Sequence, residues 1–181
     1  MKNTIVIVIG LLMSLQVSAQ KYFTRTGITQ FEASEKAFEP VEAINNSTTA
    51  ILNTNTGGVA AQVFMAGFQF KNALMQEHFN ENYMDTHKFP KATLKGQLED
   101  FSKARMTTHT SFTLNGILTI KGIEKEIQAD IFLKEENKHL HVSTIFSVRP
   151  EDFDINIPSI VRDKIAKEIQ ISVAYELVEK K

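Results

Sequence analysis

The 181-residue chain is 43% hydrophobic and 23% charged, with eight Gly, four Pro and no Cys. This composition is typical of a folded globular domain, and it excludes disordered, collagen-like and disulfide-scaffold proteins. Twenty Lys and Arg stand against 21 Asp and Glu, so the net charge is −1. Because no dense basic cluster interrupts this balance, we predict no nucleic-acid partner.

The first nineteen residues are predicted to form a secretory signal peptide. Lys2 gives a positive start, an apolar run extends from Thr4 to Leu15, and Val17-Ser18-Ala19 places small residues where signal peptidase recognises its substrate. The run is too short for a helix to cross a bilayer of about 30 Å, and no Cys follows to carry a lipid. We therefore expect an exported protein, periplasmic or secreted, with residues 20–181 as one domain.

Period-two alternation of apolar and polar residues dominates this domain and predicts antiparallel strands. The expected strands are residues 22–25, 28–33, 48–53, 59–70, 92–101, 117–121, 127–134, 139–148 and 169–177. Turn-forming residues separate several of them. These turns are Asn55 to Gly58, Asn115-Gly116, Lys121-Gly122 and the polar tip Glu135 to Lys138.

Two segments break the alternation and are predicted as short helices. From Asn72 to Met84, apolar residues recur at spacings of three and four, with Asn72 as the N-cap and an end before Pro90. The second runs from Pro158 to Lys167, with proline in its first turn. Between them, alternation around Phe153 predicts a strand with Asp152 and Asp154 on one solvated face and Phe153 and Ile155 inward.

The succession of hairpins from Ala92 to Leu177 favours a barrel over a two-sheet sandwich, because closure leaves no unpaired strand edge. We therefore predict a mainly β, single-domain fold, an antiparallel up-and-down barrel of about eight strands with one or two short helices. A barrel of this size either fills its interior with side chains or holds one small ligand. The pattern by itself leaves both arrangements open.

A series of stretches follows in a fixed order along nearly the whole mature chain: Phe68-x-Phe70, Leu74-Met75-x-x-His78-Phe79 with Tyr83-Met84, Lys88 to Ala92, Lys95-Gly96, residues 116–122 and Asp152 to Ile155. Together they resemble the YceI-like family, the polyisoprenoid-binding proteins. The resemblance implies a lipocalin-like barrel, exported to the periplasm, whose apolar tunnel holds a long isoprenoid or similar amphiphile. It implies no catalytic residues. Gln76-Glu77 replace an Arg-Asp pair before His78, so no arginine contact to a head group carries over.

The residues expected to line this tunnel are apolar, and many are aromatic or methionine. The pattern alone favours a filled core over a lining, whereas the resemblance favours the lining. The predicted ligand is an isoprenoid or fatty lipid, with no metal and no other cofactor. The tunnel residues are Phe64, Phe68, Phe70, Leu74, Met75, Phe79, Met84, Leu118, Ile120, Phe146, Phe153 and Ile155, with His78 at the polar mouth.

Two other functions remain open at this point. One is a periplasmic interaction or stress-response module with a filled core and no ligand. The other is a metal-dependent enzyme, since His139 and His141 share one strand face at a spacing that can chelate a transition metal. No third ligand is identifiable nearby, so two polar residues on the barrel exterior are the simpler interpretation. A transient contact with a membrane or membrane protein, and a homodimer, also remain open.

Overall fold

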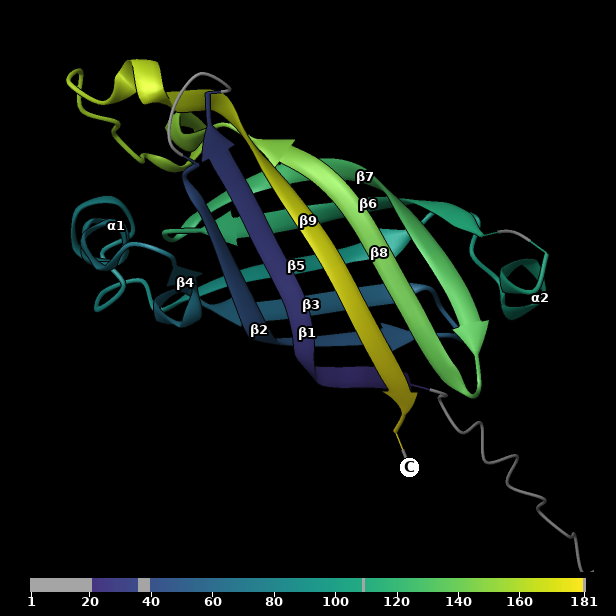
Figure 1. Cartoon of the computed structure of the whole chain (residues 1–181). Helices are drawn as coiled ribbons and strands as arrows, with labels where there is room; N and C mark the ends of the chain where they lie inside the picture. The colour runs from purple at the N-terminus through teal and green to yellow at the C-terminus, as the bar shows by residue number, and fades with distance from the viewer. Residues whose placement is uncertain (1–20, 36–39, 109, 181) are drawn as a thin grey trace, which may run out of the picture.

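The computed structural model describes residues 21–35, 40–108 and 110–180. The predicted signal peptide, residues 1–19, lies outside the described residues. Within them, the chain forms a barrel of long tilted strands, with the short helix α1 at one end and the short helix α2 at the other (Figure 1).

Eight strands close into one antiparallel barrel, and a ninth, β4, pairs with β2 alone. The order is β1-β9-β8-β7-β6-β5-β3-β2, and pairing of β1 with β2 closes it. The predicted mainly β, up-and-down barrel is confirmed. The strands are β1 (Lys21–Ser34), β2 (Glu42–Asn53), β3 (Gly58–Phe64), β4 (Gln69–Phe70), β5 (Lys91–Leu98), β6 (Ser111–Ile120), β7 (Ile123–Glu136), β8 (His139–Val148) and β9 (Ile165–Glu179).

The first predicted helix is confirmed, although it is not uniform. α1 (Ala73–His78) continues into a wider π-helical turn, η2 (Phe79–Tyr83). The side chain of Asn72 accepts hydrogen bonds from the backbone N–H groups of Leu74 and Met75, as expected of an N-cap. Helix α2 (Lys103–Met106) was not predicted. It is a single turn whose cap is Ser102, which accepts from the Arg105 N–H.

The second predicted helix, Pro158 to Lys167, is wrong. The segment holds only a 3₁₀ turn, η4 (Arg162–Lys164), and β9 begins at Ile165. Ile165 pairs with Ser34 of β1, and Ile169 pairs with Val148 of β8. Two strand neighbours therefore extend β9 into a segment that local propensity assigned to a helix.

The predicted strand around Phe153 is also wrong. Residues Pro150–Phe153 form a 3₁₀ helix, η3, and Asp154 follows in the left-handed conformation at φ +53°, which aspartate tolerates better than most residues. The Arg149 guanidinium donates two hydrogen bonds to the Asp152 carboxylate, at 3.0 and 3.1 Å, and thereby holds the turn. Phe153 still points inward and is 2% exposed.

The turn predicted at Asn115-Gly116 does not exist, because both residues lie inside β6. Gly116 is opposite Gly96 of β5. A Cβ atom on Gly96 would lie 2.6 Å from the Asn115 carbonyl oxygen and 2.9 Å from the Gly116 Cα. These glycines therefore permit a close approach of two strands. The other three predicted turns are confirmed, with positive φ at Gly57, Gly122 and Asn137.

Two hydrophobic clusters occupy the ends of the barrel interior. The cluster near α2 includes Leu98, Leu114, Leu140 and Leu177, each at most 1% exposed, with Phe101 and Met106 packed against it. The other cluster lies near α1 and η3 and includes Met65, Phe68, Met84 and Phe153. The 3₁₀ turn η1 (Met65–Gly67) joins β3 to β4 at this end. In the part of the chain that the structure describes, no helix is long and apolar enough to cross a membrane.

Replacing Gly96 with alanine is expected to destabilise the barrel. The new Cβ meets backbone atoms, which cannot move aside as a flexible side chain can, and the cost should be about 1–3 kcal/mol. Thermal unfolding followed by circular dichroism should show a Tm several degrees lower. Gly58→Ala is the control, because its Cβ would approach only side-chain atoms, the Thr56 hydroxyl at 3.3 Å and the Gln97 Oε1 at 3.7 Å. Equal Tm values for the two variants would contradict this account.

Candidate functional site

The barrel encloses a cavity of about 520 Å³. All eight barrel strands contribute residues to its wall, and most of those residues are apolar. The volume lies within the range of about 300–1,000 Å³ that is usual for sites holding a small molecule. The interior is therefore not filled by side chains alone.

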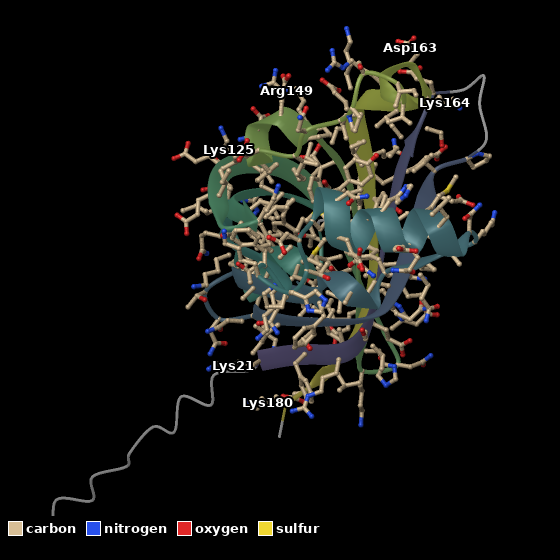
Figure 2. All side chains as sticks on the ribbon, turned by 90° about the vertical axis from the view of Figure 1, so that its left-hand side faces the viewer. Lys21, Lys125, Arg149, Asp163, Lys164 and Lys180 are labelled. Carbon is tan, nitrogen blue, oxygen red and sulfur yellow. The ribbon has the colours of Figure 1, made fainter. Side chains whose placement is uncertain are left out.

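The mouth of the cavity lies at the α1 end of the barrel. Leu74, Met75 and His78 of α1 line it on one side, and Val161 and Lys164, from the segment before β9, line it on the other. Viewed toward this end, α1 runs across the face of the barrel and Lys164 lies at the upper edge (Figure 2). Leu74 is 58% exposed, so an apolar side chain lies at the entrance in contact with solvent.

Four phenylalanines form one wall of the cavity beside the mouth. The ring centroids of Phe31 and Phe68 are 5.2 Å apart, those of Phe31 and Phe79 are 5.5 Å apart, and those of Phe70 and Phe79 are 5.1 Å apart. Such tilted and stacked pairs stabilise one another beyond their buried area. They come from β1, the η1–β4 segment and η2, so the aromatic wall ties the helix to the barrel.

Most of the predicted tunnel residues lie in the cavity wall. The structure brings together Phe68, Phe70, Leu74, Met75, Phe79, Met84, Leu118, Ile120, Phe146, Phe153 and Ile155. His78 is exposed and lies at the mouth, where it was predicted. Their role in binding a ligand stays a prediction.

Phe64 does not line the cavity, contrary to the sequence prediction. It is 50% exposed on the outside of the barrel, and the Lys91 ammonium lies 4.9 Å from its ring centroid. The alternation was extended through one strand from Val59 to Phe70, but η1 interrupts that strand. Met65, the residue after Phe64, points inward instead.

Sequence reasoning missed the polar residues of the cavity wall. Thr29, Thr48 and Tyr175 all line it, and the Thr29 hydroxyl lies 2.8 Å from that of Thr48 and 2.9 Å from that of Tyr175. Burial raises the pKa of the Tyr175 phenol, so it stays protonated at neutral pH. The available signal was the inward parity of these polar residues within otherwise apolar strand faces.

The two histidines considered as metal ligands lie on the barrel exterior. The His139 side chain is 44% exposed and its Nδ1 contacts the Glu176 carboxylate, while His141 pairs across the strands with Glu176. Across residues 21–35, 40–108 and 110–180, no group of three or more His, Cys, Asp or Glu side chains is placed to hold a metal ion. The position of the two histidines agrees with the polar-exterior interpretation.

Charge is nearly absent from the cavity wall. Of the described residues that line it, Lys164 at the mouth is the only one with a formal charge at neutral pH, apart from the titratable His78. An ion in the interior would therefore lie without a counter-charge, which is strongly unfavourable. The arrangement suits an uncharged or amphiphilic guest whose hydrocarbon part is buried.

The comparisons with known proteins agree with this architecture. A family model described as the YceI-like domain matches residues 16–177. No curated protein matches the sequence closely enough to count as a relative. The fold is similar to Burkholderia cenocepacia BcnA, with a TM-score of 0.71 at 14% identity, covering 83% of this chain and 96% of that one.

Two other solved structures share the fold at low identity. A domain from Saccharophagus degradans, described as polyisoprenoid binding and implicated in plant cell wall breakdown, gives a TM-score of 0.73 at 10% identity, covering 88% of this chain and 98% of that one. The Campylobacter jejuni YceI protein gives a TM-score of 0.65 at 16% identity, covering 80% of this chain and 87% of that one. At these identities the likeness establishes the fold alone.

Filling the cavity should reduce its capacity for apolar molecules. Ala50 is 4% exposed and lines the cavity, so Ala50→Phe places a ring in the interior. We expect the affinity for the hydrophobic dye N-phenyl-1-naphthylamine, measured by fluorescence titration, to fall about tenfold or more, because dye and ring compete for one volume. Ala174→Phe, on the exposed face of β9, is the matched control and should bind the dye like the wild type.

Proposed function

The chain belongs to the YceI-like family, and from this membership together with the apolar cavity we propose that it is an exported, non-enzymatic lipid-binding protein. It sequesters or carries a polyisoprenoid-like molecule, or another long-chain amphiphile, inside the barrel. The observation that carries the proposal is the cavity of about 520 Å³ whose wall is mainly apolar. The description of the S. degradans neighbour as polyisoprenoid binding supports the choice of ligand class.

Apolar burial alone is strong enough for such binding. Each buried CH₂-sized group contributes about 0.8 kcal/mol, so one five-carbon isoprene unit contributes roughly 3–4 kcal/mol before ordering costs. Micromolar affinity corresponds to about −8 kcal/mol. A few isoprene units therefore reach that affinity without any contact to a head group.

The alternative, a module with a filled core, is less well supported. Close packing does occur at the mouth, where the Phe68 and Phe79 ring centroids lie 5.9 Å apart. Beyond this wall the cavity extends to Leu98, Leu133 and Leu177 near the α2 end. A core that served only stability would be packed to the density of an organic crystal and leave no space of this size.

Transient contact with a membrane or a membrane protein belongs to the same proposal, because an apolar cargo has to enter from, or leave to, an apolar environment. Leu74 at the mouth and Ile160 in the turn before β9 are 58% and 86% exposed. Exposed apolar side chains of this kind favour contact with lipid or with a partner. The homodimer that the sequence leaves open is no part of this proposal.

The proposal predicts a lipid in the natively exported protein. Solvent extraction followed by mass spectrometry should release one apolar molecule per protein chain, and Ala50→Phe should lower this ratio while Ala174→Phe leaves it unchanged. Empty extracts from repeated preparations, together with failure of added prenyl lipids to bind, would overturn the proposed function.

The proposal also predicts cleavage after Ala19. N-terminal sequencing of protein recovered from the periplasm or the medium should begin at Gln20, because Val17-Ser18-Ala19 presents small residues to signal peptidase. Ala19→Arg should block processing and leave the longer precursor in the membrane fraction. A wild-type chain that retains Met1 in the exported fraction would contradict the signal-peptide assignment.

A further inference from the structure

A cluster of three hydroxyl groups lies inside the cavity where the barrel closes. Thr29 of β1, Thr48 of β2 and Tyr175 of β9 belong to it, and Thr29 and Thr48 are 7% and 1% exposed. The Thr29 oxygen lies 2.8 Å from the Thr48 oxygen and 2.9 Å from the Tyr175 oxygen. All three residues line the cavity, and Tyr175 is the one that is only partly buried, so a guest reaches the cluster through its phenol.

Most residues around this hydroxyl cluster are apolar. The exception on β8 is Thr144, which lines the cavity opposite Val173 and donates its hydroxyl hydrogen to the Asp130 carbonyl oxygen. Along β9 the inward neighbours of Tyr175 are Val173 and Leu177, and along β2 the next inward residue after Thr48 is Ala50. Gly27 of β1 makes room for the ring, because a Cβ atom there would lie 2.5 Å from the Tyr175 Cδ1. The hydroxyl cluster is thus a defined polar group in a mainly apolar section of the wall.

The hydroxyl cluster has hydrogen-bonding capacity left for a guest. Each hydroxyl supplies one donor and two acceptor sites. The two hydrogen bonds within the cluster use two of the three donors and two of the six acceptor sites. A guest hydroxyl or amide can donate to an open site, and a guest carbonyl can accept when one protein hydroxyl rotates toward it.

The lack of charged side chains around the hydroxyl cluster, within the part of the chain that the structure describes, limits which polar group of a guest can bind there. The charged Lys164 and the titratable His78 lie at the mouth, and no other described residue of the cavity wall is ionisable in the physiological range. A carboxylate or phosphate beside Tyr175 would be buried without a counter-ion, whereas a neutral hydroxyl or carbonyl would find hydrogen-bond partners. The polar group that fits beside the hydroxyl cluster is therefore uncharged.

We propose that the cavity binds its amphiphile head first, with an uncharged hydroxyl or carbonyl head hydrogen-bonded to Thr29, Thr48 and Tyr175 and the hydrocarbon chain extending toward the mouth. A strand rises about 3.3 Å per residue. The stretch of β9 from Tyr175 back to Ile165 therefore gives the hydrocarbon chain of the ligand a path on the order of 30 Å. This inference rests on the proposed function and specifies its ligand class.

The first test compares geranylgeraniol with the hydrocarbon that lacks only its hydroxyl. Tyr175→Phe keeps the ring and removes its oxygen, so the affinity for geranylgeraniol should fall about threefold to tenfold while the affinity for the hydrocarbon stays unchanged. Thr48→Val, which keeps the shape of threonine, should behave in the same way. Tyr22→Phe removes the phenol oxygen of a tyrosine that does not line the cavity, and it should change neither affinity.

The outcomes separate this inference from the proposed function. Equal losses for alcohol and hydrocarbon in Tyr175→Phe, or no loss for either, would overturn the head-first arrangement and leave the carrier function standing. Tighter binding of geranylgeranyl phosphate than of geranylgeraniol to the wild type would also overturn it, since the phosphate has no counter-charge at this depth. If neither alcohol nor hydrocarbon binds the wild type, the proposed function fails as well.

A second test reads the orientation directly. A geranylgeraniol analogue with a photoreactive diazirine at the tail end is cross-linked inside the protein, and the modified peptide is identified by mass spectrometry. Labelling of Leu74 or Met75 at the mouth is the expected result. Labelling of Leu133 or Leu177 at the opposite end would show that the tail enters first and would overturn the inference.

Discussion

The pairing of β1 with β2 on one side and with β9 on the other is the constraint on which the rest of the structure depends. β1 runs antiparallel to both, from Tyr22 opposite Leu52 and Glu179 to Glu32 opposite Glu42 and Gln170. Without this closure the sheet would have two long open edges, which attract other strands. With it, one face of every strand encloses an interior, and a cavity becomes possible.

Closure divides the interior into sections with different chemistry. Near α2, leucines such as Leu140 and Leu177 are fully buried and form a packed end. Near α1, aromatic side chains of the barrel and of η2 contact one another and frame the mouth. Between them lies the cavity, and the hydroxyl cluster of Thr29, Thr48 and Tyr175 is the polar point at which β1, β2 and β9 meet. The hydroxyl groups that link the closing strands are therefore also the groups proposed to bind the head of the ligand.

Local sequence patterns predicted the wall of the barrel well because a strand's period of two is a local property. Asn72 predicted the start of α1 correctly, since an N-cap bonds only to the residues that follow it.

The predictions failed where a distant partner outweighed local preference. Pairing with Ser34 and Val148 draws residues 165–169 into β9, and the Arg149–Asp152 pair stabilises a 3₁₀ turn where alternation predicted a strand. Phe64 was assigned to the lining because the alternation gives no sign of η1. This turn changes which residues of the segment face inward, so the pattern that holds after η1 does not extend back to Phe64.

The sequence by itself determined the fold class, the single domain and the family resemblance, and most of the residues that it assigned to the cavity do line the wall. These features follow from alternation, turn residues and the order of motifs, which are all local properties of the chain. Tertiary structure alone decided that Gly96 and Gly116 meet across two strands, that the interior is open rather than filled, and that Thr29 and Tyr175 share a hydrogen bond. The physical reason is that each of these depends on strand register and barrel closure. Register and closure are set by pairing between residues far apart in the chain, and a local sequence pattern does not specify those partners.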